Sequence, residues 1–122
     1  MRRWNGWGDD GFEMATPESG LGFLAEKVAP GSKLPDADLA TVCAQVPKYR
    51  LPEHALIETA EEDRVRHARG QSLPDWLAMR SGDFGVFPDG VSYPESTEQV
   101  EEILNFAYEQ GFDVIPYGGG TS

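Results

Sequence analysis

The sequence predicts a small helical N-terminal region followed by a strand–helix–strand unit, which is a fold class of α+β passing into α/β. Three segments between residues 16 and 84 combine helix-capping residues with apolar residues at helical spacing. Nearer the C-terminus, one strongly amphipathic segment lies between two short β-prone segments. A β-α-β connection makes its two strands parallel, and a parallel sheet needs cover on both faces. We therefore expect a sheet that begins in this chain and stays incomplete.

The bulk properties describe a soluble chain of one domain. It has 122 residues, of which 39% are hydrophobic and 25% charged. No run of about 18 apolar residues occurs, so we expect no transmembrane helix. Arg2 and Arg3 near the N-terminus are not followed by an apolar segment, so a secretory signal is not indicated and the cytoplasm is the expected compartment.

Net charge and cysteine content exclude several classes of partner. The formal net charge is −11, which repels nucleic acid and anionic membrane surfaces. Cys43 is the single cysteine, so neither an internal disulfide nor a cysteine-rich metal site is expected. Most of the acidic residues are expected to lie on a solvated surface.

Residues 1–15 predict an irregular aromatic arm. Trp4, Trp7 and Phe12 occur among glycines and aspartates with neither a strand nor a helix period. We expect these aromatic residues to dock on another surface, including one that is not part of this chain.

Residues 16–84 predict a helical N-terminal region, and its first helix follows Thr16. Thr16 is placed to cap this helix, and Pro17 suits its first position. The apolar residues at helical spacing are Leu21, Leu24 and Val28.

A second short helix is predicted after Asp36, its candidate cap, and Pro47 ends it. One apolar stripe is expected to face the core, formed by Leu39, Val42, Cys43 and Val46. Within this stripe Cys43 is expected to be a buried small hydrophobe and not a nucleophile.

The middle of the chain gives weaker signals. Residues 55–59, "ALIET", fit either a short strand or a loop. A third helix is predicted at about residues 73–80, with Ser72 as its cap and Gly82 just past its end.

Residues 85–122 predict the β-α-β unit. A short strand is expected at 91–93, and a second at 112–116. Between them, Ser96 and Gln99 have the spacing of a capping box, and Gly111 fits the position just past the helix end.

The second predicted strand leads into the glycine loop "PYGGGTS", residues 116–122. Glycines let a ligand approach the backbone closely, successive N–H groups can bind an anion, and Thr121 and Ser122 add hydroxyl donors. In open α/β sheets, ligands bind outside the carboxyl ends of strands. Neither G-x-x-x-x-G-K-[ST] nor G-x-G-x-x-G is present, so the residues alone leave a phosphate site and a simple tight turn both open.

The segment "FPDGVSYPESTEQVEEILNFAYEQGFDVIPYGGGTS" resembles the start of the FAD-binding domain of FAD-linked oxidases of the vanillyl-alcohol oxidase class. Upstream, "RRWNGWGDDG" and "RVRHARGQSLPDWLAMRSGDFG" are similar to bacterial flavoproteins of the alkyldihydroxyacetonephosphate synthase branch. The resemblance spans nearly the whole chain. It identifies residues 85–122 as the beginning of an FAD-binding domain.

The resemblance implies that the glycine loop wraps the FAD pyrophosphate through backbone N–H groups. The residues that match this stretch are Pro116, Tyr117, Gly118, Gly119, Gly120, Thr121 and Ser122. Two further sets match the family, and for both we favour a structural role or a solvated surface over function. They are Pro88, Val91 and Pro94 at the first strand, and the basic cluster Arg66, His67 and Arg69.

Family members are several hundred residues long, and their catalytic histidine and tyrosine residues follow the loop. This chain is therefore expected to be an N-terminal piece of such an enzyme, inactive alone. The sequence itself offers no catalytic constellation and no metal site, and it gives His54 no partner.

The function implied by the resemblance is FAD-dependent ether-lipid synthesis, in which a long-chain alcohol replaces the acyl group of acyl-dihydroxyacetone phosphate. The expected partners are FAD and a small lipid precursor, and a homodimer is open for the longer parent. Two alternatives stay open: an FAD-dependent 2-hydroxy-acid dehydrogenase of the glycolate or D-lactate type, which would take a hydroxy-acid substrate, and a non-catalytic interaction module.

Overall fold

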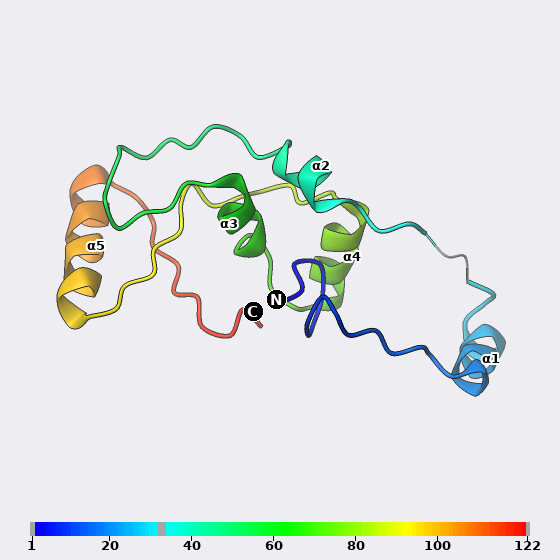
Figure 1. Ribbon diagram of the computed structural model, residues 1–122. Helices are drawn as coiled ribbons and strands as arrows, with labels where there is room; N and C mark the ends of the chain where they lie inside the picture. Colours follow the sequence, from blue (N-terminus) through cyan, green and yellow to red (C-terminus); the bar gives the residue numbers. More distant parts are fainter. Residues whose placement is uncertain (1, 32–33, 122) are drawn as a thin grey trace.

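The computed structural model describes residues 2–31 and 34–121. Figure 1 shows an elongated arrangement with α1 at one end, α5 at the other, and the two termini side by side between them. The nearness of the termini is confirmed by a hydrogen bond of 3.0 Å from Arg2 to the carbonyl of Gly119. The described helices are α1 (Glu18–Lys27), α2 (Leu39–Cys43), α3 (Glu61–Arg66), α4 (Leu73–Ser81) and α5 (Thr97–Gln110).

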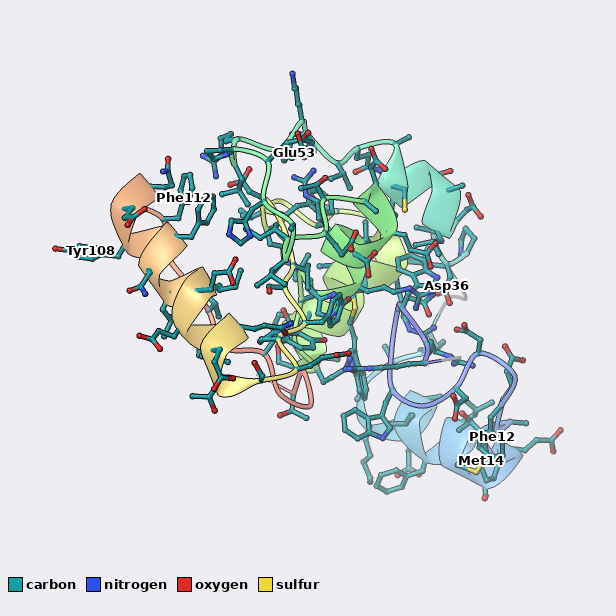
Figure 2. All side chains as sticks on the ribbon, turned by 60° about the vertical axis from the view of Figure 1, so that its left-hand side comes forward. Phe12, Met14, Asp36, Glu53, Tyr108 and Phe112 are labelled. Carbon is teal, nitrogen blue, oxygen red and sulfur yellow. The ribbon has the colours of Figure 1, made fainter. Side chains whose placement is uncertain are left out.

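Helix α1 contributes no buried residue to the described structure. Its cap is Pro17, so the prediction of Thr16 as cap is wrong; without a side-chain cap its first N–H groups remain open. The predicted apolar stripe of Leu21, Leu24 and Val28 is at least half exposed at every position. In Figure 2, Phe12 and Met14 of the preceding segment lie on the same side of the molecule as this helix, far from α5.

Helix α2 begins at Leu39, two residues after the start that the predicted cap Asp36 would give. Asp38 is the cap, and its carboxylate accepts a hydrogen bond of 3.0 Å from the Thr41 amide. The prediction of Asp36 as cap is therefore wrong, and the Asp36 carboxylate instead pairs with Arg80 at 3.1 Å. The predicted stripe is confirmed, because Val42 is buried and its other three members pack against the core.

The core is small and takes one buried residue from each of four segments: Val42 of α2, Val65 of α3, Met79 of α4, and Phe84 after α4. Trp4 stacks on Phe84 with ring centroids 6.2 Å apart. The N-terminal arm thus docks one of its aromatic residues on this chain's own core, whereas the sequence analysis had left open which surface the arm contacts. Trp7 and Phe12 remain about two-thirds exposed.

Helix α3 is the element that the sequence analysis missed, and it carries a buried charge. The exposed fraction of Arg64 is 2%, yet the residue lies beside the core. Its guanidinium donates to two backbone carbonyls, at 2.6 Å to Pro88 and at 2.8 Å to Pro47. One helix therefore holds two distant chain segments through a single side chain.

Helix α4 matches its prediction. Ser72 caps it, and a reciprocal capping box joins Ser72 to Asp75. The hydrogen bond from the Ser72 hydroxyl is the main reason that the pKa of Asp75 is lowered. Gly82 ends the helix in the left-handed conformation, as predicted.

Helix α5 also matches its prediction, with Ser96 accepting from the Gln99 amide at 3.3 Å and Gly111 left-handed at the end. The return bond of the box differs slightly, because Gln99 Oε1 accepts from the amide of Glu95 and not from that of Ser96. Tyr108 on the outer side of α5 points away from the rest of the chain (Figure 2) and is 89% exposed.

Neither predicted strand forms within the described residues. Val91 makes an isolated antiparallel bridge with Glu58, with N–O distances of 2.8 and 2.9 Å. The segment 112–116 pairs with no described residue, and Ile115 within it is 86% exposed. Extended segments need neighbours to become strands, so the parallel sheet stays a prediction.

Tyr93 attaches the segment after the Val91 bridge to α3. Its hydroxyl donates to the Asp63 carboxylate at 2.8 Å, and its ring meets the edge of His67 with centroids 5.5 Å apart. About half of Tyr93 is exposed, but desolvation of the hydroxyl and the nearby carboxylate raise the pKa of Tyr93 to about 12.

Removal of the Arg64 side chain should destabilise the fold. In Arg64→Met, the carbonyls of Pro47 and Pro88 lose their donors, and we expect the free energy of unfolding to fall by about 2–4 kcal/mol. Urea denaturation followed by circular dichroism measures this change. Arg50→Met is the matched control, because its guanidinium pairs with Asp89 at the surface with 82% of the side chain exposed. Equal losses of unfolding free energy in the two variants would contradict a structural role for the two Arg64 hydrogen bonds.

Tyr93 should titrate well above the ordinary range of a tyrosine. Tyrosinate absorbance, compared between the native chain and Tyr93→Phe, should place the pKa of Tyr93 near 12 and not near its ordinary value of about 10. Asp63→Asn should bring it down, since the acceptor loses its charge. Because the folded pKa exceeds the unfolded one, this group's stabilisation is complete below about pH 10 and is lost as the pH rises through about 12. A measured pKa of Tyr93 near its ordinary value of about 10 would contradict the hydrogen bond to Asp63.

Candidate functional site

The predicted cofactor loop lies against the beginning of the chain. Within its described part, residues 116–121, two carbonyls accept hydrogen bonds: that of Gly119 from Arg2, and that of Thr121 from the Gln71 amide at 3.4 Å. The Tyr117 hydroxyl donates to the carbonyl of Arg66 at 3.3 Å. Ser122, the last predicted site residue, lies outside the described residues. The loop is thus held by the N-terminal arm and by the segment that follows α3.

Gly120 is the one loop glycine whose identity the packing requires. It is buried, and its φ of +68° is rarely adopted by other residues. A Cβ atom at this position would overlap the Tyr117 hydroxyl and the Arg2 guanidinium. Because Gly120 has no side chain, the loop backbone can approach the Tyr117 hydroxyl closely.

Gly118 and Gly119 show the opposite behaviour. Neither has a positive φ, a Cβ atom on Gly118 would meet nothing within 4 Å, and one on Gly119 would meet only the Thr121 methyl group at 3.9 Å. Nothing in the described structure requires glycine at these two positions. The amides of residues 118–121 also donate to no other described residue. The carbonyls of Gly119 and Thr121 are engaged, while the N–H groups of residues 118–121 are available.

The structure brings the predicted basic cluster next to this loop. Arg66 donates to the carbonyl of Arg2 at 2.9 Å and pairs with Glu62 at 2.7 Å. Arg69 donates to the carbonyl of Phe84 and lies 3.7 Å from an Asp75 carboxylate oxygen. Arg66, His67 and Arg69 were expected to lie on a solvated surface. In the structure they are partly buried beside the loop.

Arg2 and Arg3 join the cluster, although the sequence analysis gave them no role. The Arg2 guanidinium lies 5.9 Å from the centre of the Tyr117 ring. Arg3 donates to the carbonyl of Phe12 at 2.9 Å, within the turn closed by the bridge between Arg2 and Asp9. Two adjacent arginines at the start of a strongly acidic chain were the signal that could have found them.

His67 connects the loop to α3. Its ring contacts Tyr117 edge-on at 4.5 Å, and its Nδ1 lies 2.7 Å from the Asp63 carbonyl oxygen. A carbonyl only accepts hydrogen bonds, so His67 Nδ1 carries a proton and donates it to this oxygen.

The remaining family-matched residues serve the fold. The Pro88 carbonyl binds Arg64, Val91 forms the bridge to Glu58, and Pro94 is exposed. The contacts of Pro88 and Val91 agree with the structural role that we favoured for these residues, and no contact of Pro94 among the described residues does so.

The other reactive side chains lie apart from the loop. Burial is the main reason that the pKa of Cys43 is raised, which disfavours the thiolate. His54 does have partners, since its Nε2 is 3.5 Å from Glu102 and its ring is 4.4 Å from Phe106. Among the described residues no group of three or more acidic, histidine or cysteine side chains is arranged to hold a metal ion. Nor does any helix in that part of the chain have the length and apolar character needed to cross a membrane.

Comparison with known proteins gives one consistent set of matches. No protein-family model matches the sequence. An alkyldihydroxyacetonephosphate synthase of Caenorhabditis elegans is 25% identical over 148 aligned positions that cover 98% of this chain and 25% of the relative. The enzyme of the same name from Dictyostelium discoideum is 36% identical over 59 residues, 48% of this chain and 10% of the relative.

Solved structures agree in fold. Two structures of an alkyldihydroxyacetonephosphate synthase superpose with TM-scores of 0.76 and 0.75, each at 23% identity over 99% of this chain and 28% of the solved chain. At this identity the match establishes the fold. The relatives and structural neighbours of this chain are thus alkyldihydroxyacetonephosphate synthases, enzymes of the FAD-linked oxidase type, and the chain spans about a quarter of the length of the worm relative and of the solved structures.

Proposed function

We propose that this chain forms part of an FAD-dependent enzyme similar to alkyldihydroxyacetonephosphate synthase, in which the glycine loop binds the FAD pyrophosphate. The observation that carries the proposal is the behaviour of Gly118 and Gly119. Their glycine identity serves no packing purpose among the described residues, while their amides have no partner. Close approach of an anionic ligand to the backbone accounts for both facts.

The fit of the loop to a pyrophosphate rests on its fixed and free groups. Arg2 and Gln71 hold the carbonyls of Gly119 and Thr121, so the loop is preorganised by this chain itself. Four successive amides, residues 118–121, would supply the donors. Pro116 and Tyr117 would shape the entry to the loop, and Ser122 completes the matched stretch.

In such an enzyme the flavin supplies the chemistry and the protein supplies binding and orientation. The proposed reaction is ether-lipid synthesis, with acyl-dihydroxyacetone phosphate and a long-chain alcohol as substrates. Similarity to alkyldihydroxyacetonephosphate synthases favours this reaction over oxidation of a 2-hydroxy acid. Catalytic residues are proposed to lie in portions of such an enzyme that this chain does not span.

We further propose that segments 91–93 and 112–116 become parallel strands when a longer protein supplies their neighbours. Val114 and Ile115 are 45% and 86% exposed, although their residue types favour burial in a sheet. The relatives are about five times as long as this chain, which leaves ample sequence for the rest of a sheet.

Blocking Gly118 should abolish FAD binding without unfolding the chain. In Gly118→Val, the new side chain projects into open space, so thermal stability should change little while the loop amides become covered. The test uses a chimera in which this chain replaces the matching quarter of the Caenorhabditis elegans relative, and flavin absorbance after gel filtration measures binding. Gly22→Val is the control for an open glycine far from the loop. Retention of flavin by the Gly118 variant would contradict the proposal.

The same chimera tests the reaction. If this chain is the functional equivalent of the replaced quarter, the chimera should release fatty acid from acyl-dihydroxyacetone phosphate in an alcohol-dependent manner. A chimera that folds and binds FAD but turns over only a 2-hydroxy acid would favour the dehydrogenase. One that folds and binds no flavin would favour the interaction module.

A further inference from the structure

A small cavity adjoins the glycine loop and is lined by six cationic or polar residues together with the apolar side chains of Trp4 and Met79. Its volume is about 100 Å³. A bulk water molecule accounts for about 30 Å³, so the cavity has room for a group the size of a few waters and not for a flavin ring system. The polar lining is Arg2, Arg3, Arg66, His67, Arg69 and Gln71.

This concentration of positive charge is unusual for this chain. Four of its seven arginines line one cavity, although its formal net charge is −11. Glu62 and Asp75 pair with Arg66 and Arg69. Arg2 and Arg3 bind backbone carbonyls and form no ion pair with another described residue. Positive charge is therefore left uncompensated at the cavity.

Donor groups are left over as well. Each guanidinium has five N–H donors, and the recorded bonds use only some of those on Arg2 and Arg3. The Nε of Arg69 is buried and has no hydrogen-bond partner. A buried N–H without a partner is costly, so an acceptor from a bound molecule would satisfy it.

We infer that this cavity is a subsite for a phosphate group. Guanidinium forks match phosphate oxygens in bidentate geometry, and a tetrahedral oxyanion fits the available volume. The subsite is distinct from the loop amides, yet it is coupled to them, because Arg2 also holds the carbonyl of Gly119 and the Arg66 carbonyl accepts from Tyr117.

Two molecules could carry this phosphate: FAD, through its diphosphate, or a phosphomonoester substrate of the kind that the relatives' name includes. The choice between them rests on the proposed function, whereas the phosphate subsite itself does not. The experiment below separates the two sources.

The first arm uses the 122-residue chain with inorganic phosphate. At constant ionic strength, phosphate should raise the unfolding temperature above the value in chloride, and calorimetry should give a saturable binding curve. Arg3→Gln and Arg69→Gln should each weaken phosphate binding at least tenfold. Arg50→Gln and Arg80→Gln, at arginines outside the cavity, should leave it within about twofold. Since Arg69 also binds the Phe84 carbonyl, Arg3→Gln keeps the test valid if the Arg69 variant fails to fold.

The second arm identifies the carrier in the chimera. If FAD supplies the phosphate, FAD should displace inorganic phosphate and riboflavin should not. If the substrate supplies it, glycerol 3-phosphate should displace phosphate from the FAD-loaded protein. Gly118→Val should remove FAD binding and leave phosphate binding intact, so failure of the proposed function is distinguishable. Absence of any phosphate effect beyond that of chloride, or equal weakening by the control variants, would overturn the subsite.

Discussion

The fold depends on the buried guanidinium of Arg64. Its two hydrogen bonds, to the carbonyls of Pro47 and Pro88, join α3 to two other chain segments. In the described part of the chain, no common sheet or helix connects these three segments. A core with one large buried residue per segment offers little apolar area to each of them. Charge-assisted hydrogen bonds to backbone carbonyls are directional, whereas hydrophobic contacts are not. The hydrogen bonds of Arg64 therefore fix how the segments are oriented. Because the guanidinium is buried away from water, losing either carbonyl partner would cost free energy. The backbone at Pro47 and at Pro88 is therefore held in place.

Helix α3 extends this role from the core to the candidate site. Residues on one side of it enter the core, through Arg64 and Val65. At its end, Arg66 and His67 contact Arg2 and Tyr117, so the start of the chain and the glycine loop meet on one short helix. This arrangement engages the carbonyls of Gly119 and Thr121 and leaves the amides of residues 118–121 without an acceptor among the described residues. That asymmetry is what an anion-binding loop requires, because donors must face the ligand while acceptors face elsewhere.

Local signals predicted part of this structure well. Helices α4 and α5 could be placed to within a residue because caps and C-terminal glycines act through bonds between neighbours in sequence. Helix α3 escaped notice because it is six residues long with little apolar periodicity, although three acidic residues open it and two arginines close it, in accord with the helix dipole. The cap of α2 was misplaced because two aspartates precede that helix, and Asp36 instead binds Arg80, 44 positions away. At α1 no side chain caps the helix, and its first helical residue follows Pro17.

The sequence by itself determined the strongest helices, the apolar stripe of α2, the glycine loop and the family resemblance, all of which depend on residues close together along the chain. Only the tertiary structure decided that Arg2 and Arg3 lie with Arg66 and Arg69 beside that loop, and that Gly120 serves packing while Gly118 and Gly119 do not. The physical reason is separation in sequence: contacts between residues about 50 or more positions apart leave no local period. Whether a position requires glycine depends on the atoms that pack against it in the folded chain.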